Sequence, residues 1–130
     1  MSKSILIVDD EPNIVLSLEY LMTRAGYRAT AAYDGQAALD LLDECRPDLL
    51  ILDVMMPRKN GFEVCTEIRA HPVFSRLPIL MLTAKGREQE MKKGLALGAD
   101  AYVTKPFSTR ELLVRVHELL ERETIGEAHP

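Results

Sequence analysis

The sequence contains no tryptophan, and only two of its 130 residues, Cys45 and Cys65, are cysteines. The two cysteines do not form a pair with metal-ligand spacing, and both fall in segments with helical periodicity. We therefore interpret them as small buried apolar residues. Unpaired thiols are typical of proteins kept in a reducing compartment, which favours a cytoplasmic location over secretion.

The chain also lacks a long apolar run and an excess of basic residues. None of its apolar runs approaches the roughly 20 residues that a membrane-spanning helix needs. The run that follows Ser4 is too short for the apolar region of a signal peptide. The 16 basic and 20 acidic residues give a formal net charge of −4, which argues against a domain that grips nucleic acid by its phosphates. The composition thus predicts a cytoplasmic domain without direct membrane or nucleic-acid contact.

Short apolar runs alternate with amphipathic segments along the whole chain. The runs with strand character are residues 5–8, 28–32, 49–52, 79–82 and 101–104. The segments with helical spacing run from Pro12 to Ala25, from Asp34 to Cys45, from Phe62 to Ile68, from Arg87 to Leu97 and from Ser108 to Leu120. Continuous apolar strands are expected where both faces of a parallel sheet are covered. The alternation therefore predicts a three-layer α/β fold with a parallel sheet and right-handed crossovers.

Length and local signals complete this picture. A chain of 130 residues is expected to form one domain, which we place at residues 1–123, with a polar, frayed C-terminal tail at 124–130. Asp34 can cap the second helix, and Ser108 with Glu111 forms a capping box for the last one. Asn60-Gly61 reads as a turn pair. Gly94 costs the fourth helix about 1 kcal/mol of propensity relative to alanine.

Polar side chains follow four of the predicted strands, at the point where each strand ends. They are Asp9, Asp10, Asp53, Thr83 and Lys105. Because the carboxyl ends of parallel strands lie at one edge of a sheet, where such folds bind ligands, we expect these side chains to share a pocket. Three carboxylates at close range repel one another unless a counter-charge is present. A hard divalent cation such as Mg²⁺, which prefers oxygen ligands, supplies that charge, and the Lys105 ammonium supplies more.

Asp53 is the candidate nucleophile of this pocket, because it ends the central strand and lies between the acid pair and Thr83. A carboxylate can accept a phosphoryl group to form an acyl phosphate. Such a transfer needs little more than alignment and charge neutralisation. Thr83 can donate a hydrogen bond to the phosphoryl group, while Asp9, Asp10 and the metal hold its other side.

These residues resemble the receiver domain of bacterial two-component response regulators, of which chemotaxis regulators are one kind. The segments that carry the resemblance are Val8-Asp9-Asp10-Glu11-Pro12, Asp48 to Asp53, Met56-Pro57, Gly61-Phe62-Glu63, Thr83-Ala84, Gly98-Ala99-Asp100 and Tyr102 to Phe107. The resemblance covers about residues 4–122, with five motifs in order. It implies a flavodoxin-like (βα)5 fold whose five parallel strands have the order 2-1-3-4-5.

The resemblance also implies a phosphorylation-dependent signalling switch rather than an enzyme, one that assists its own phosphorylation and dephosphorylation. Asp53 would take its phosphoryl group from a histidine kinase or a phosphotransfer protein. Asp10, Asp53 and the backbone carbonyl of Met55 would ligate Mg²⁺, or Mn²⁺ in its place, and Asp9 would act through water. Thr83 would reorient toward the phosphoryl group.

Other positions would pass on or tune the signal. Tyr102 would turn inward behind Thr83 and change the surface of the fourth helix, fifth strand and fifth helix, although packing in the strand also accounts for a tyrosine there. The Lys105–Pro106 bond would be cis, which places the ammonium. Met55 and Lys85 flank the site at positions that vary within the family. Our hypothesis for Met55 is that its apolar side chain hinders the attacking water, so that the phosphorylated form persists.

The downstream partner is either another protein or a tethered output domain. Glu111 and Arg115 match charged positions that one DNA-binding subfamily uses for a phosphorylation-dependent homodimer. Ala101 stands where those relatives usually carry an acid, which weakens the dimer prediction.

Two other functions fit parts of the pattern. A metal-dependent phosphatase of the haloacid dehalogenase type also forms an aspartyl phosphate, but it needs a second acid two residues beyond the nucleophile, where this chain has Met55. A flavin-binding module of the same architecture would need a hydroxyl- or glycine-rich loop after the first strand. The sequence Asp9-Asp10-Glu11 at that place would repel a flavin phosphate.

Overall fold

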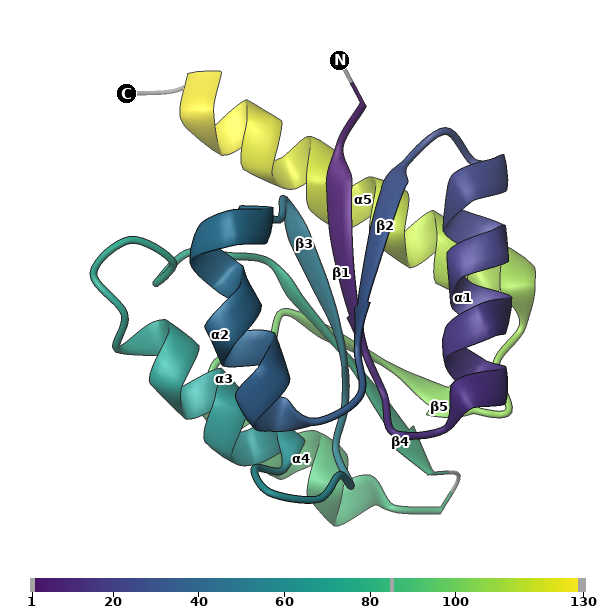
Figure 1. Cartoon of the computed structure of the whole chain (residues 1–130), viewed down its shortest axis with the longest axis vertical. Coiled ribbons are helices and arrows are strands. Elements are labelled where there is room, and N and C mark those ends of the chain that lie inside the picture. Colours follow the sequence, from purple (N-terminus) through teal and green to yellow (C-terminus); the bar gives the residue numbers. More distant parts are fainter. Residues whose placement is uncertain (1, 85, 129–130) are drawn as a thin grey trace.

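The computed structural model describes residues 2–84 and 86–128, in which strands and helices alternate (Figure 1). The strands are β1 (Ser4–Val8), β2 (Arg28–Ala32), β3 (Leu49–Asp53), β4 (Ile79–Ala84) and β5 (Ala101–Lys105). The helices are α1 (Pro12–Arg24), α2 (Gly35–Cys45), α3 (Gly61–Arg69), α4 (Glu88–Ala96) and α5 (Thr109–Ala128). All neighbouring strands pair in parallel, and their order is β2-β1-β3-β4-β5. The predicted fold class and strand order are confirmed.

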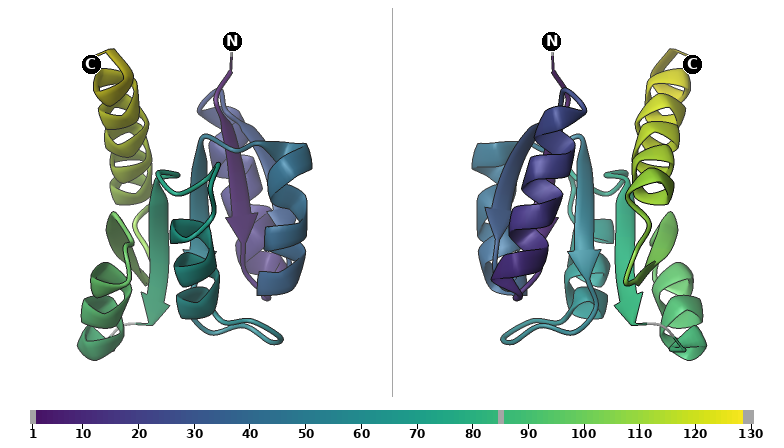
Figure 2. Two further views of the ribbon diagram at one scale, coloured as in Figure 1. Left: turned by 90° about the vertical axis from the view of Figure 1, so that its left-hand side faces the viewer. Right: turned by 90° about the vertical axis from the view of Figure 1, so that its right-hand side faces the viewer.

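The sheet is the middle of three layers, with α1 and α5 on one face and α2, α3 and α4 on the other (Figures 1 and 2). Strands β1 and β3 are buried along their whole length, because both of their faces are covered. Alternate side chains divide between the two layers: Leu6 and Leu50 pack toward α2 and α3, and Ile7 and Ile51 toward α1 and α5. This accounts for runs of aliphatic residues with no polar break.

Helix α4 approaches the sheet closely at Gly94. A Cβ atom on Gly94 would lie 2.5 Å from Met81 Sδ. Glycine at this position therefore allows α4 to pack closely on β4. This packing compensates for the lower helix propensity of glycine.

Some helix ends agree with the sequence expectation, and others differ from it. Asp34 caps α2 by accepting a hydrogen bond from the Ala37 amide, as predicted. The Asn60-Gly61 pair is not a free turn, because Asn60 is the N-cap of α3 and forms a capping box with Glu63. At α5, Ser108 Oγ accepts a 3.3 Å hydrogen bond from the amide of residue 111. Helix α5 extends to residue 128, so it continues into the segment that we placed in a C-terminal tail. The division at residue 123 stays a prediction.

The Arg69 side chain joins three segments that lie far apart in the sequence. Its guanidinium donates hydrogen bonds to the backbone carbonyls of Gly98, Ser75 and Leu77 and forms a 2.9 Å ion pair with Asp100. These contacts connect the end of α3 to the loop before β4 and to the turn between α4 and β5. Nothing in the sequence pattern distinguished Arg69 from the other surface cations.

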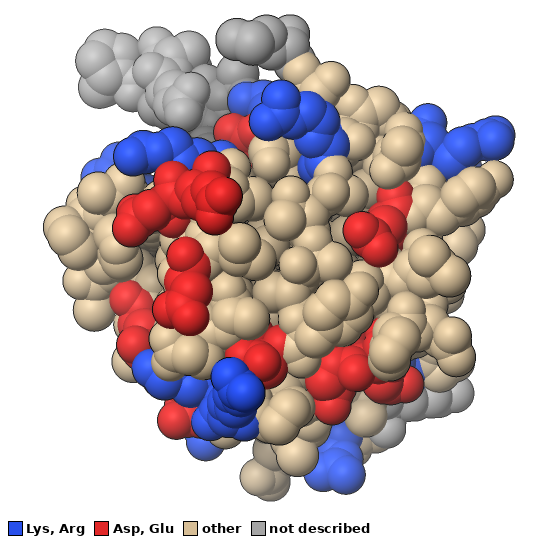
Figure 3. All heavy atoms as spheres, viewed as in Figure 1, with Lys and Arg blue, Asp and Glu red and all other residues tan. Residues whose placement is uncertain are grey.

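The structure bears on three expectations that were drawn from composition. Within residues 2–84 and 86–128, no helix combines the length and the apolar character needed to cross a bilayer. On the face shown in Figure 3, basic side chains form several small groups near the outline of the molecule, and acidic groups lie between these groups. Both cysteines are unpaired, Cys65 being buried and Cys45 half-buried.

Candidate functional site

Three carboxylates meet at the carboxyl edge of the sheet. One oxygen from each of Asp9, Asp10 and Asp53 lies within 4.8 Å of the others. The register explains this, because Val8 pairs with Leu52 and the next residues of the two strands are Asp9 and Asp53. Asp9 is fully buried and Asp53 nearly so, whereas Asp10 is exposed. The sequence therefore correctly predicted that these acids converge.

Lys105 reaches the same cluster from the end of β5. Its Nζ lies 2.7 Å from Asp9 Oδ2, 3.2 Å from Glu11 Oε1 and 3.3 Å from Asp53 Oδ1. The peptide bond between Lys105 and Pro106 is cis. The ammonium thus supplies positive charge to acids from two other segments. Its contact with Glu11 was not anticipated, although an acid directly after an acid pair could have suggested it.

Thr83 stands beside the acids, because Asp53 pairs with Leu82 of β4 and Thr83 follows. The threonine is 1% exposed, and its hydroxyl has no hydrogen-bond partner among the described residues. A buried hydroxyl without a partner is costly unless a ligand satisfies it. Together with oxygen ligands from three carboxylates, it fits a divalent cation and a phosphoryl group.

The electrostatics of the cluster favour an added cation. Burial and the negative charge of Asp9 raise the pKa of Asp53 to about 6, although Lys105 opposes the shift. Burial alone would lower the pKa of Lys105, but the hydrogen bond with Asp9 and the charge of Asp53 outweigh it, so that this pKa rises. The ammonium alone therefore leaves the carboxylates incompletely neutralised.

This raised pKa predicts a stability difference in metal-free buffer. Ionisation of Asp53 disfavours the folded state, so its contribution falls as pH rises from the usual pKa of 3.8 to about 6. Asp53→Asn is therefore expected to stabilise the domain above pH 6 by about 1–2 kcal/mol, a figure reduced for solvent screening. Urea unfolding at about pH 4 and pH 7 checks this, because the gain should shrink at the lower value. Equal gains at both values would contradict the assignment.

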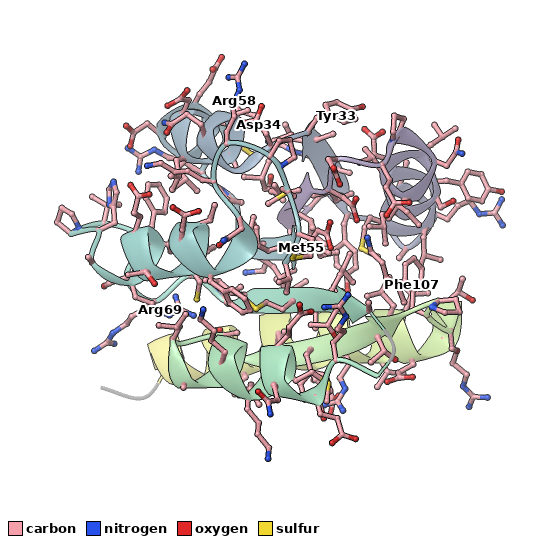
Figure 4. The ribbon with its side chains drawn as sticks, turned by 90° about the horizontal axis from the view of Figure 1, so that it is seen from below. Tyr33, Asp34, Met55, Arg58, Arg69 and Phe107 are labelled. Atoms are coloured by element: carbon pink, nitrogen blue, oxygen red, sulfur yellow. The ribbon has the colours of Figure 1, made fainter. Side chains whose placement is uncertain are left out.

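Met55 follows Asp53 by two residues, and its side chain is 64% exposed. In Figure 4, which views the molecule from below, Met55 lies near the middle, with Tyr33, Asp34 and Arg58 on one side and Phe107 on the other. The loop that holds Met55 is packed tightly where it leads into α3. A Cβ atom on Gly61 would lie 2.5 Å from the carbonyl oxygen of Asp53, which explains a glycine that we had assigned only to a turn.

Two other positions were predicted to pass on or tune the signal. Tyr102 is half-buried in β5 and packs against the core layer formed with α2 and α3. Lys85 lies outside the residues that the structure describes.

Fold and site together define a doubly wound α/β domain whose acid pocket is suited to carry a phosphoryl group on an aspartate. The chain belongs to the family of response regulator receiver domains, since the model of that family matches residues 5–117. Receiver domains are regulatory, and this chain is accordingly a phosphorylation-dependent switch of a two-component system. The match does not favour the alternative of a phosphatase acting on small substrates.

Individual relatives agree with this assignment. The chain is 49% identical over 126 residues to the alkaline phosphatase synthesis transcriptional regulatory protein PhoP of Bacillus subtilis, covering 97% of this chain and 52% of PhoP. The chain thus spans about half the length of that relative. Chemotaxis response regulator CheY4 of Vibrio cholerae superposes with a TM-score of 0.86 at 33% identity, covering 92% of this chain and 99% of CheY4. The receiver domain of Francisella response regulator 1452 gives 0.86 at 31% identity, covering 94% and 99%.

Proposed function

We propose that Asp53 accepts a phosphoryl group, in the presence of Mg²⁺, from a histidine kinase or a phosphotransfer protein. A single observation supports this most strongly: the nearly buried Asp53 clusters with two other carboxylates and lies 3.3 Å from the Lys105 ammonium. The neighbouring strand ends near it with Thr83, whose hydroxyl has no hydrogen-bond partner among the described residues. Phosphoryl acceptance uses every member of this set.

In this proposal an oxygen of Asp53 attacks the phosphorus of a phosphohistidine. The P–N bond breaks, its electron pair leaves with the imidazole, and an acyl phosphate remains. Lys105 and Thr83 each donate to a phosphoryl oxygen as negative charge moves onto it. Asp10, Asp53 and the Met55 carbonyl would hold Mg²⁺, with Asp9 acting through water, and the metal when bound neutralises phosphoryl charge. Mn²⁺ would fit the same oxygen ligands.

The proposed acceptor can be tested with a small phosphodonor. Incubation with acetyl phosphate and Mg²⁺ is expected to add the mass of one phosphoryl group to the intact protein, because the domain itself supplies the neutralising groups. Asp53→Asn should remain unmodified, since an amide is a poor nucleophile. Removal of Mg²⁺ by a chelator should suppress labelling of the wild type. Equal labelling of Asp53→Asn would show that another residue is the acceptor.

Loss of the phosphoryl group is expected to depend on Met55. Its exposed side chain beside Asp53 can obstruct the water that attacks the acyl phosphate, whereas an amide can orient such a water by hydrogen bonding. We expect Met55→Asn to shorten the lifetime of the phosphorylated form severalfold, as measured by phosphate release after removal of the donor. A matched control is Val73→Asn, because Val73 is exposed to a similar degree in the loop before β4. An unchanged or longer lifetime in Met55→Asn would refute the hypothesis, and Lys85 would be tested in the same way.

The output of the switch is proposed to pass through the face formed by α4, β5 and α5. Half-buried Tyr102 lies on β5 of this face, and Ala101, Arg115 and Leu119 are among the residues that line a shallow hollow there. The partner that binds this face would be a downstream protein or a tethered output domain. A phosphorylation-dependent homodimer through Glu111 and Arg115 is the weaker proposal, because Ala101 offers no charge. A cytoplasmic location also stays a prediction.

A further inference from the structure

The ammonium group of Lys105 is shared among three carboxylates. Its Nζ lies 2.7 Å from Asp9 Oδ2, 3.2 Å from Glu11 Oε1 and 3.3 Å from Asp53 Oδ1. An ammonium has three protons to donate, and three carboxylate oxygens lie within 3.3 Å of Nζ here. Lys105 must therefore weaken one of these contacts before it can donate to a phosphoryl oxygen on Asp53.

The three contacts differ in what their loss costs. The Asp9 side chain is 0% exposed, so no water can take the place of the ammonium there. The Asp53 side chain is 8% exposed and carries the phosphoryl group itself, so Lys105 stays near it. The Glu11 side chain is 61% exposed, and water solvates its carboxylate as soon as the contact breaks. The contact with Glu11 is consequently the one that Lys105 gives up when it donates to a phosphoryl oxygen.

The local structure of Glu11 supports a role directed at Lys105. Glu11 occupies the N-cap position of α1, where a side-chain oxygen usually accepts a hydrogen bond from an amide of the first helical turn. The Glu11 side chain makes no such bond. Instead it accepts a hydrogen bond from Lys105, 94 residues farther along the chain. Its carboxylate thus serves the site rather than the helix.

We propose that Glu11 is a positioning residue that competes with the phosphoryl group for the Lys105 ammonium and thereby slows phosphorylation of Asp53. This inference rests on the proposed function. The transfer is the one described above, in which an O–P bond forms at Asp53 and the bond to the donor's leaving group breaks. Glu11 takes no part in bond making and acts only through the position of Lys105.

The test compares three variants of the same domain. Glu11→Gln removes the charge, and Glu11→Asp keeps the charge on a side chain one methylene shorter that falls short of Lys105. Glu88→Gln is the control, since Glu88 is an exposed acid at the start of α4, at the same end of the sheet. With acetyl phosphate and Mg²⁺, we expect both Glu11 variants to be labelled about two- to fivefold faster than the wild type. Glu88→Gln should be labelled at the wild-type rate.

A second measurement examines the contact without metal or donor. The NMR resonance of the Lys105 Cε atom in metal-free protein should shift in both Glu11 variants and stay in place in Glu88→Gln. If Glu11→Gln is labelled faster but Glu11→Asp is not, the negative charge at this position matters rather than its contact with Lys105, and the proposal is overturned. Unchanged labelling of both Glu11 variants would also overturn it. If the wild type itself acquires no phosphoryl group on Asp53, the proposed function fails instead, and an unmoved Cε resonance would then also exclude the contact.

Discussion

Replacing Lys105 with methionine is expected to slow labelling of Asp53 by acetyl phosphate about 10²–10³-fold. The Lys105 Nζ lies 3.3 Å from Asp53 Oδ1 and is the cation that pairs with the proposed phosphoacceptor. Methionine keeps much of the length and apolar stem of lysine but cannot donate a hydrogen bond or offset negative charge. The rate is measured by intact mass at saturating Mg²⁺, so that weaker metal binding does not imitate the effect.

The same substitution is expected to destabilise the metal-free domain by about 3 kcal/mol, because it leaves a buried carboxylate without its cation. Asp9 is 0% exposed, and Lys105 is its ion-pair partner at 2.7 Å. Adding Mg²⁺ should recover part of this loss, since the metal brings a new positive charge to the same oxygens. Lys59→Met serves as the control, because the Lys59 pair with Glu67 is exposed and its loss should cost less than about 1 kcal/mol. Labelling of Lys105→Met at the wild-type rate would contradict the assigned role of Lys105.

The residues that converge at the site were predictable because they obey a simple rule of the fold. Each of Asp9, Asp53 and Thr83 follows or ends a run of aliphatic residues, and parallel strands bring such ends to one edge. The strand order came from the resemblance to receiver domains and not from hydrophobic periodicity, because five apolar runs alone allow more than one order.

Other features could not be read from the sequence because they depend on tertiary contacts. In the sequence, Gly94 only lowers the propensity of a helix, whereas its close packing against Met81 depends on the tertiary structure. Glu11 looked like part of a motif, and its contact with Lys105 spans 94 positions. The extent of α5 to residue 128 is not apparent from the sequence, because the apolar periodicity ends earlier than the helix does. Each of these features is set by a tertiary contact or by backbone geometry, which composition and periodicity do not specify.

Arg69→Ala is expected to lower the free energy of unfolding by about 3 kcal/mol, the second large effect among the variants. The guanidinium donates to the carbonyl oxygens of Gly98 at 2.6 Å and Leu77 at 2.7 Å, and it pairs with Asp100 at 2.9 Å. Alanine leaves the carbonyl oxygens of Gly98 and Leu77 partly buried without this donor, whereas Asp100 keeps the Ile79 amide and Arg122 as partners. Hydrogen bonds from a charged donor contribute more than neutral ones, which places the cost above that of an ordinary surface substitution.

Urea unfolding of Arg69→Ala measures this cost, and two further variants define its cause. Arg24→Ala removes an exposed arginine whose only side-chain hydrogen bond and ring contact among the described residues are with Tyr20 in its own helix, so we expect a loss below about 1 kcal/mol. Arg69→Lys keeps the charge but not the planar array of donors, and it should recover only a small part of the loss. We expect only partial recovery, because one planar group bonds both the loop before β4 and the turn before β5. Full recovery by lysine would contradict this and show that charge alone matters.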